Sequence, residues 1–346
     1  MNVGLIGCGF IGRKHLEAVM DSSDLQLAAV CDVSDEAMKA VVERYQSFFP
    51  AARVNAYRKY AELLVDSNVD IVVVSTLSGL HGRIAKEALI QGKHVVVEKP
   101  MALSVQEARE MNRLSRMFGG KLAVCHQKRF YPHLQELKRL LSSGGIGQII
   151  HAEMTLRINR DDAYYAQAPW RGSWEMDGGV LMNQAIHNID LLYWFAGKPR
   201  SAAGAIGRLL RPIEAEDTAS AVAETEPGGI VQVHATVCAA RGHTEERLRL
   251  LGSKGTIELT GKQLAEITDW CVPGVELPDW KPADDGYAAL YADLVQAVQT
   301  NREPLVNGEE GMIALEWILA VYRAAKERRT IDLPLEQFST MEMMES

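Results

Sequence analysis

The feature that most constrains the fold is a glycine-rich turn near the amino terminus, set between a strand pattern and a helix pattern. Residues 2–6 are a short apolar run typical of a buried strand, and Gly7, Gly9 and Gly12 follow it. Gly7 allows a tight turn, Gly9 lets the backbone approach a pyrophosphate, and Gly12 permits the next helix to pack closely on the strand. The turn therefore predicts dinucleotide binding. Its predicted cofactor contacts are Gly7, Gly9, Phe10, Ile11 and Gly12.

An acidic residue selects the cofactor. Residues 27–31 have the pattern of a second strand, and Asp32 ends it about 20 residues past the glycines. A carboxylate at this point binds ribose hydroxyls, and Asp35 and Glu36 would repel a 2′-phosphate. We therefore predict NAD as the cofactor, with NADP less favoured. The alternative role for Asp32 is that of a helix N-cap.

A charged pair ends a later buried strand. Residues 94–97 include three consecutive valines, and Glu98, Lys99 and Pro100 follow them. Lys99 should emerge at the carboxyl end of the strand, where open α/β sheets bind their ligands. A Lys after a Glu is more often a solvated surface pair, but the neighbouring motifs favour chemistry. Lys99 is therefore a candidate catalytic residue.

Polar residues follow two further strands of the predicted sheet. Ser75 and Thr76 end the strand at 69–74, where small side chains can line a cofactor groove. His81 lies near the start of the next helix, where capping or packing is as good an interpretation as cofactor contact. Gln127 follows the strand at 121–125, and we expect it to contact both cofactor and substrate.

The secondary-structure pattern changes near the middle of the chain. Up to residue 124, strands alternate with helices, which predicts a doubly wound parallel sheet. From about residue 147, long strands predict one large, mostly antiparallel sheet covered by helices. We therefore expect an α/β protein with a Rossmann domain at 1–124 and an α+β domain for substrate binding and oligomerisation at 125–346.

Composition excludes several functional classes. The net charge is −8 and Lys and Arg are scattered, which argues against nucleic-acid binding. No apolar run approaches the roughly 20 residues of a membrane helix, and no signal-peptide pattern is present, so we expect a cytoplasmic protein. The five cysteines contain no CxxC pair, so we predict neither a metal site nor a disulfide framework.

A second polar cluster lies on a helix predicted over 179–196. Asn183 and His187 are four residues apart and should share one face of it. A lone His on an apolar helix is usually a core residue, but the polar Asn183 favours a site. Asp190 would either orient the imidazole or serve as a surface acid.

The segment 164–174 is rich in aromatic residues and arginine. Tyr165, Trp170 and Arg171 could stack on a pyranose ring and hold a hydroxyl or carboxylate. An aromatic oligomer contact is the competing interpretation. Arg129, which follows the strand at 121–125, is a further predicted substrate contact.

The glycine turn, the Glu98-Lys99-Pro100 strand end and the Gly-Gly helix with His187 resemble, in order and spacing, the Gfo/Idh/MocA oxidoreductase family. The resemblance covers nearly the whole chain. It implies a Rossmann domain joined to an open-sheet α/β domain, and oxidation or reduction of a carbinol on a sugar or cyclitol. It also implies that Lys99 and His187 act at the substrate hydroxyl, and that Glu98 and Lys99 border the nicotinamide.

One departure from the family pattern matters. Many members carry Asp four residues before the catalytic His, where this chain has Asn183. An amide cannot accept a proton, so acid/base work falls to His187 or Lys99, and Asn183 would hydrogen-bond a substrate hydroxyl. With Tyr164 and the tryptophans upstream, the chain is similar to members that oxidise pyranosides or UDP-sugars at C3.

The expected function is therefore NAD-dependent hydride transfer with a polyhydroxylated small molecule. The alternatives are an inositol or cyclitol dehydrogenase and a non-catalytic NAD-binding sensor, against which the presence of both Lys99 and His187 argues. We expect no nucleic-acid or membrane partner. If one face of the C-terminal sheet is apolar enough, it should form a homo-oligomer interface in a dimer or tetramer.

Overall fold

The computed structural model describes residues 1–280 and 285–344, and the chain divides into two compact units. The first unit comprises Met1–Ala102, Gln106–Gln127 and Asp285–Gly311. The second unit comprises Leu103–Val105, Lys128–Asp284 and Met312–Ser346, of which 281–284 and 345–346 lie outside the described residues.

The first unit contains a parallel sheet of six strands in the order β3-β2-β1-β4-β5-β6. Its strands are β1 (Asn2–Ile6), β2 (Gln26–Cys31), β3 (Asn55–Tyr57), β4 (Ile71–Val74), β5 (His94–Val97) and β6 (Leu122–Val124). The strand order reverses between β1 and β4, and ligands of such sheets bind at the carboxyl ends of the strands near this point. The predicted doubly wound parallel sheet is confirmed.

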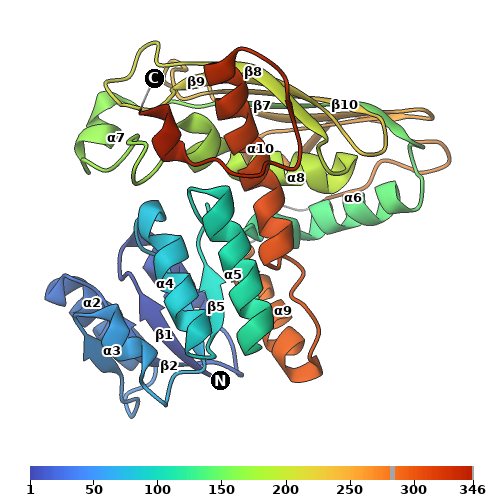
Figure 1. The fold of residues 1–346 in the computed structure, drawn as a ribbon. Helices are drawn as coiled ribbons and strands as arrows, with labels where there is room; N and C mark the ends of the chain where they lie inside the picture. Colours follow the sequence, from blue (N-terminus) through green and yellow to red (C-terminus); the bar gives the residue numbers. More distant parts are fainter. Residues whose placement is uncertain (281–284, 345–346) are drawn as a thin grey trace. The chain divides into compact units, whose positions relative to one another are not determined.

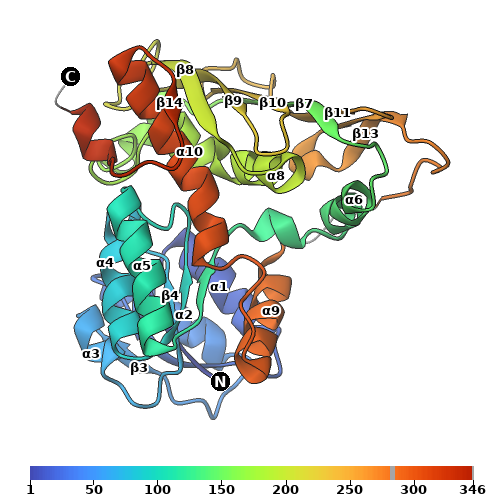
Figure 2. The same cartoon turned by 45° about the vertical axis from the view of Figure 1, so that its right-hand side comes forward.

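Helices cover the sheet of the first unit (Figures 1 and 2), and α4 and α5 lie side by side over its strands. The helices are α1 (Phe10–Met20), α2 (Asp35–Gln46), α3 (Tyr60–Leu64), α4 (Ser78–Ile90), α5 (Val105–Phe118) and α9 (Tyr287–Thr300). The valines of β4 and β5 are fully buried, as expected for strands covered on both faces.

The first unit is discontinuous in sequence, which differs from the predicted division at residue 124. Residues 285–311, with α9, belong to it. His15 of α1 lies 2.9 Å from the Tyr291 hydroxyl of α9, and its ring packs edge-on against Tyr287. These contacts join segments that are far apart in the sequence, so a pattern read along the chain does not reveal them.

The second unit contains a sheet of eight strands in the order β13-β12-β11-β7-β10-β9-β8-β14. Its strands are β7 (Ile149–Arg157), β8 (Ser201–Gly207), β9 (Thr218–Glu224), β10 (Ile230–Thr236), β11 (Glu245–Gly252), β12 (Thr256–Thr260), β13 (Glu266–Cys271) and β14 (Ile331–Asp332). Only the pairing of β7 with β10 is parallel among these strands. The predicted mostly antiparallel sheet is confirmed.

Helices of the second unit pack on the sheet or flank it (Figure 1). They are α6 (Pro132–Ser142), α7 (Asp162–Ala166), the π-helix η2 (Val180–Ala185), α8 (Ile186–Ala196) and α10 (Gly308–Glu327), whose first residues belong to the first unit. α8 lies against β7 and β10. Within residues 1–280 and 285–344, no helix combines the length and apolarity needed to cross a membrane.

The sheet face opposite α8 is more polar than the predicted oligomer interface requires. Arg247 lies 3.8 Å from both Glu153 and Glu258, so oppositely charged side chains cross the strands there. Val222 and Ile230 expose apolar groups on the same sheet, but they stand among these polar residues. The condition that this face be apolar is therefore not met, and any contact between copies would rest on polar complementarity.

Candidate functional site

The glycine turn has the geometry that a dinucleotide needs. Gly7 has φ +97°, and a Cβ there would lie 2.4 Å from the main-chain oxygen of Ser75. A Cβ at Gly12 would lie 2.0 Å from the oxygen of Gly7, whereas one at Gly9 would meet nothing within 4 Å. Gly9 is also the N-cap of α1, so no side chain covers the start of the helix. The turn thus offers open main-chain amides to a pyrophosphate.

Asp32 braces this turn from the end of β2. Its Oδ2 accepts the main-chain N–H of Cys8 at 2.7 Å, and its Oδ1 accepts that of Ser34 at 2.9 Å. Ser34, and not Asp32, is the N-cap of α2, which removes the capping alternative. A carboxylate has about four acceptor positions, so Asp32 can also receive ribose hydroxyls. These residues fit NAD.

Ser75, Thr76 and His81 follow β4 and differ in their accessibility. Ser75 Oγ donates to the main-chain oxygen of Gly7 at 2.9 Å and so helps to hold the glycine turn. The ring nitrogens of His81 lie 2.8 Å from the oxygen of Pro100 and 3.1 Å from that of Thr76. His81 is buried, and burial lowers its pKa. The packing interpretation therefore fits His81 better than cofactor contact.

Glu98 is a buried carboxylate at the end of β5. Its Oε1 accepts from the Tyr287 hydroxyl at 2.8 Å and lies 3.2 Å from His15 Nε2, and its Oε2 accepts the main-chain N–H of Lys99 at 3.1 Å. Burial alone would raise its pKa, but His15, the charge of Lys99 and the Tyr287 hydroxyl together lower it to about 2. The negative charge of Glu98 therefore persists beneath the half-buried Lys99.

His15, Glu98 and Cys125 also form a buried group whose donor atoms lie within 4.8 Å of one another. Such side chains can bind a metal ion, but cysteine does so as the thiolate. Burial, reinforced by the charge of Glu98, raises the pKa of Cys125 well above its ordinary value. The absence of a metal site stays a prediction.

In the second unit, the predicted helix over 179–196 is two elements. Residues Val180–Ala185 form the π-helix η2, and α8 begins at Ile186. Asn183 lies in η2 and His187 in the first turn of α8, and both are half-buried. A π-helical turn before an α-helix is frequent at functional sites.

Asn183 belongs to a hydrogen-bonded chain that the sequence pattern did not reveal. Its Nδ2 donates to Asp177, and its Oδ1 accepts from Gln184 Nε2. Gln184 Oε1 in turn accepts from Arg160 at 3.1 and 3.3 Å. The one available signal was the position of Asp177, directly before the Gly178-Gly179 turn that opens the helix.

The aromatic loop surrounds Arg171. Its guanidinium lies 4.1 Å from the ring centre of Tyr164 and 5.6 Å from that of Trp170. Its Nη1 donates to the main-chain oxygen of Tyr164 at 2.8 Å. Tyr165 packs edge-on against Tyr164, and burial raises the pKa of Tyr165. Tyr165, Trp170 and Arg171 are thus held in one loop by stacking and main-chain contacts.

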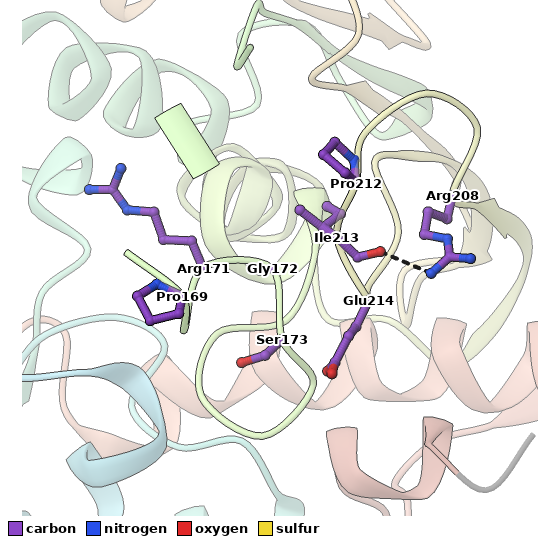
Figure 3. A pocket seen from close by; sticks show the side chains of 8 residues that line it. All are labelled: Pro169, Arg171, Gly172, Ser173, Arg208, Pro212, Ile213 and Glu214. Carbon is purple, nitrogen blue, oxygen red and sulfur yellow. Dashed lines mark hydrogen bonds between the residues drawn. The ribbon is translucent and has the colours of Figure 1, made fainter. Parts of the chain in front are cut away.

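A small cavity of about 290 Å³ lies beside this loop (Figure 3). It is lined by Pro169, Arg171, Gly172, Ser173, Arg208, Pro212, Ile213 and Glu214. Figure 3 shows the guanidinium of Arg171 pointing away from Glu214, while Arg208 donates to the oxygen of Ile213 at 3.2 Å. The charged ends of both arginines are therefore engaged by the protein itself.

Arg129 differs from its predicted role as a substrate contact. It is 1% exposed, and its Nε and Nη2 donate to the two oxygens of Asp190 at 2.8 and 2.7 Å. A bidentate, buried pair of this kind fixes α8 to the segment before α6. The prediction failed because a charged residue after a strand end can face the protein interior when a buried carboxylate there pairs with it. Asp190 is buried in this pair and is therefore not a surface acid. Its predicted role in orienting His187 stays a prediction.

The structure brings the predicted site residues together within each unit. In the first unit, Gly7, Asp32 and Ser75 meet around one turn, and Glu98 and Lys99 end β5. Gln127 is half-buried at the last position of this unit's second segment. In the second unit, Asn183 and the Tyr164 loop are linked through Gln184, whose Nε2 lies 3.4 Å from the Tyr164 hydroxyl. Lys99 and His187 belong to different units.

Comparisons with known proteins agree with this arrangement. The family described as "Oxidoreductase family, NAD-binding Rossmann fold" matches residues 1–126, and "GFO/IDH/MocA C-terminal domain" matches residues 134–258. The crystal structure of the WlbA dehydrogenase from Bordetella pertussis, in complex with NADH and UDP-GlcNAcA, is 33% identical with a TM-score of 0.88 and covers 97% of this chain and 99% of that one.

Two further relatives have names that indicate other substrates. Inositol 2-dehydrogenase 2 of Saccharopolyspora erythraea is 31% identical over 269 residues, which are 75% of this chain and 73% of that protein. D-apiose dehydrogenase of Paraburkholderia graminis is 26% identical over 345 residues, which are 95% of this chain and 88% of that protein. With a Rossmann unit that binds NAD and a matching second unit, the chain is an oxidoreductase that belongs to the GFO/IDH/MocA family.

Proposed function

We propose that the protein is an NAD-dependent dehydrogenase that transfers a hydride between nicotinamide and a ring carbinol of a pyranoside or nucleotide sugar, at C3. The observation that carries the proposal is the full-length likeness, at 33% identity, to a dehydrogenase crystallised with NADH and UDP-GlcNAcA. The aromatic loop around Arg171 supports it, because stacked rings and guanidinium groups suit a polyhydroxylated, anionic substrate.

Each candidate residue has a role in this reaction. Bound NAD supplies the hydride acceptor at its nicotinamide ring. Lys99 and His187 act at the reacting hydroxyl, and one of them takes its proton as the carbon–hydrogen bond breaks. Two assignments are compatible with the chemistry: either Lys99 is the base, or Lys99 keeps its charge and stabilises the alkoxide while His187 is the base. Asn183 orients the substrate by hydrogen bonding.

The remaining binding assignments belong to the same proposal. Main-chain groups of the glycine turn hold the pyrophosphate, and Asp32 holds the ribose. Gln127 contacts both cofactor and substrate, and Tyr165, Trp170 and Arg171 contact the sugar or its substituent. We also propose a cytoplasmic homo-oligomer, dimer or tetramer, formed by polar complementarity through the charged outer face of the sheet of the second unit.

A second candidate function is inositol or cyclitol oxidation. The relative named inositol 2-dehydrogenase 2, at 31% identity, favours it. A cyclitol has no anomeric substituent, so it would leave the loop around Arg171 without a charged ligand group to bind. This is the physical reason for placing pyranosides and nucleotide sugars first.

A substrate panel tests the proposal. The purified protein would be incubated with NAD and with UDP-sugars, free pyranosides or inositols, while the absorbance of NADH and the mass of any bound cofactor are followed. NADH formation with a sugar supports the proposal, and formation with inositols alone would replace it by the second candidate. If the protein is purified with NADH bound, the matching 3-keto sugars would be added instead. No turnover with either set of substrates would refute the proposed substrate class.

A further inference from the structure

Four polar side chains of the second unit form a continuous hydrogen-bonded chain. It runs from the guanidinium of Arg160 through the amides of Gln184 and Asn183 to the carboxylate of Asp177. We call these four residues the amide chain. A cation stands at one end and an anion at the other, so the hydrogen bonds polarise one another in the same direction.

The two charged ends fix the orientation of both amides. Arginine can only donate, so Gln184 must turn its Oε1 to Arg160 and its Nε2 to Asn183. An ionised carboxylate can only accept, so Asn183 must turn its Nδ2 to Asp177. Both conditions demand the same orientation of the Asn183 amide. The alternative, flipped amide would place donor against donor at one contact and acceptor against carboxylate at the other.

Both ends of the amide chain are themselves anchored. Asp177 is 2% exposed, and its Oδ2 accepts the main-chain N–H of Gly172 at 2.8 Å. The main-chain N–H of Arg160 donates to the oxygen of Val237 at 3.0 Å, and its guanidinium lies 4.9 Å from the Tyr164 ring centre. Neither end can follow a rotating amide without breaking these contacts.

We propose that Asp177 and Arg160 are positioning residues that lock the Asn183 amide, fixing which side carries its oxygen and which its N–H groups. A substrate hydroxyl then meets Asn183 in one orientation only. The inference rests on the proposed function, in which Asn183 contacts the substrate. It also explains how the Asn183 amide can serve where many family members have Asp: the Asp177 carboxylate is hydrogen-bonded directly to that amide.

An exchange of the two end groups tests the lock. In Asp177→Asn, the new amide can accept from Gly172 or from Asn183, but not from both, because its other position becomes a donor. In Asn183→Asp, two carboxylates face each other. In the double variant, the amide at position 177 accepts from Gly172 and donates to the carboxylate at 183, which still accepts from Gln184. These three hydrogen bonds are then satisfied again.

Thermal unfolding followed by tryptophan fluorescence reads out the exchange without any substrate, since all six tryptophans lie in the second unit. Each single variant should lower the Tm, on the order of 5 °C, and the double variant should recover most of that loss. Asp161→Asn is the matched control, because Asp161 caps α7 and makes its bond to Tyr164. Combined with Asn183→Asp, it should restore nothing. Tm losses that simply add in the Asp177 double variant would overturn the lock.

The Asn183→Asp variant should also respond to pH with a known sign. Two carboxylates in contact cannot both ionise, so its Tm deficit should shrink as the pH falls from 8 to 5, values chosen to be roughly on either side of the raised pKa of such a pair. The charge of Asp177 also acts on Glu216 and Tyr165, and the guanidinium of Arg160 lies at the other end of the amide chain. The double variant lacks the facing carboxylates, and its deficit should stay constant, which separates the pair from those neighbours.

Steady-state kinetics tests the positioning role itself. Asp177→Asn should lower kcat/KM about ten- to one-hundredfold, with the Kd of NADH unchanged. Arg160→Met should raise the substrate KM about tenfold, and Arg160→Lys, which retains a donor, should stay within about threefold of the wild type. Equal KM values for Arg160→Met and Arg160→Lys, or full activity of Asp177→Asn, would overturn the positioning role. Absent turnover by the wild type would instead refute the proposed function. The Tm values of the single and double variants would still show whether Asp177 fixes the orientation of the Asn183 amide.

Discussion

The hydroxyl of Tyr287 donates to Oε1 of Glu98 at 2.8 Å in the interior of the first unit. Tyr287 comes from α9 and Glu98 from the end of β5, so this bond ties a late segment of the chain to the strand that presents Lys99. Because hydrogen bonds to a carboxylate favour its charged form, the contact helps to keep Glu98 ionised.

Tyr287→Phe should therefore destabilise the protein by about 1–3 kcal/mol at pH 7. The folded-state pKa of Glu98, about 2, lies below its unfolded value, so its contribution is fully present above about pH 4.3 and is lost as the pH falls toward 2. The cost of the variant should thus shrink as the pH falls from 5 toward 2, values taken to be about the edges of that window. Urea unfolding followed by circular dichroism measures it. Tyr45→Phe, which removes an acceptor for the N–H of Leu27, should cost the same at both pH values.

Lys99→Met should abolish turnover while NAD binding survives. General acid–base groups and charge stabilisation at the reacting oxygen contribute about 10²–10⁴-fold each, so kcat should fall by at least about 10³. The Kd of NADH should change by less than about threefold, because the glycine turn and Asp32 are untouched. Lys86→Met on α4, which removes a Lys paired with Glu107 at 3.1 Å, is the control. Normal turnover by the Lys99 variant would exclude Lys99 from the chemistry.

Local patterns were sufficient to predict the sheet of the first unit. The glycine turn and Asp32 have a fixed relation to the two strands that they follow, and the runs of buried valine mark the next two. Such features depend on neighbours along the chain, and the structure places the residues at the strand ends expected for them. The second sheet was predictable for the same reason, since its long strands alternate between buried and exposed side chains.

Contacts between distant segments were not predictable. Arg129 and Asp190 are 61 residues apart, and nothing in either neighbourhood indicates that each is buried against the other. The bonds of Asn183 to Asp177 and Gln184 depend on the π-helical turn, whereas the pattern of apolar residues predicted a continuous α-helix. Periodicity records which faces are buried. It does not record which polar groups satisfy one another inside.

Arg129→Met should destabilise the second unit by about 3–5 kcal/mol, because it leaves the Asp190 carboxylate buried without its bidentate partner. The double variant Arg129→Met with Asp190→Leu should regain most of this loss, since it removes the uncompensated charge. Urea unfolding followed by tryptophan fluorescence measures both. Arg323→Ala breaks an exposed pair with Glu327 on α10 and should cost less than about 0.5 kcal/mol. If the two arginine variants lost the same free energy of unfolding, the buried pair would contribute no more to stability than the pair on α10.

Glu216 should make the stability of the second unit fall with rising pH. Burial raises the pKa of Glu216 to about 8, and the charge of Asp177 adds to this, although hydrogen bonds from Leu181 and Tyr322 oppose it. Its folded-state pKa lies above the unfolded value of about 4.3, so the folded state binds the extra proton. The corresponding stability is fully present below about pH 4.3 and is lost as the pH rises through about 8.

Glu216→Gln removes this titration while keeping an oxygen to accept from the Leu181 N–H at 2.9 Å and the Tyr322 hydroxyl at 2.9 Å. Relative to the wild type, the variant should therefore gain stability as the pH rises, by about 1 kcal/mol per pH unit between roughly pH 5 and pH 8. Urea unfolding at several pH values, followed by tryptophan fluorescence, provides the comparison. Glu224→Gln, at an exposed position of β9, should show no such trend. A constant difference between Glu216→Gln and the wild type across this range would mean that Glu216 is ionised in the folded protein, and the Gly178-Gly179 turn above it would then rest on a buried negative charge.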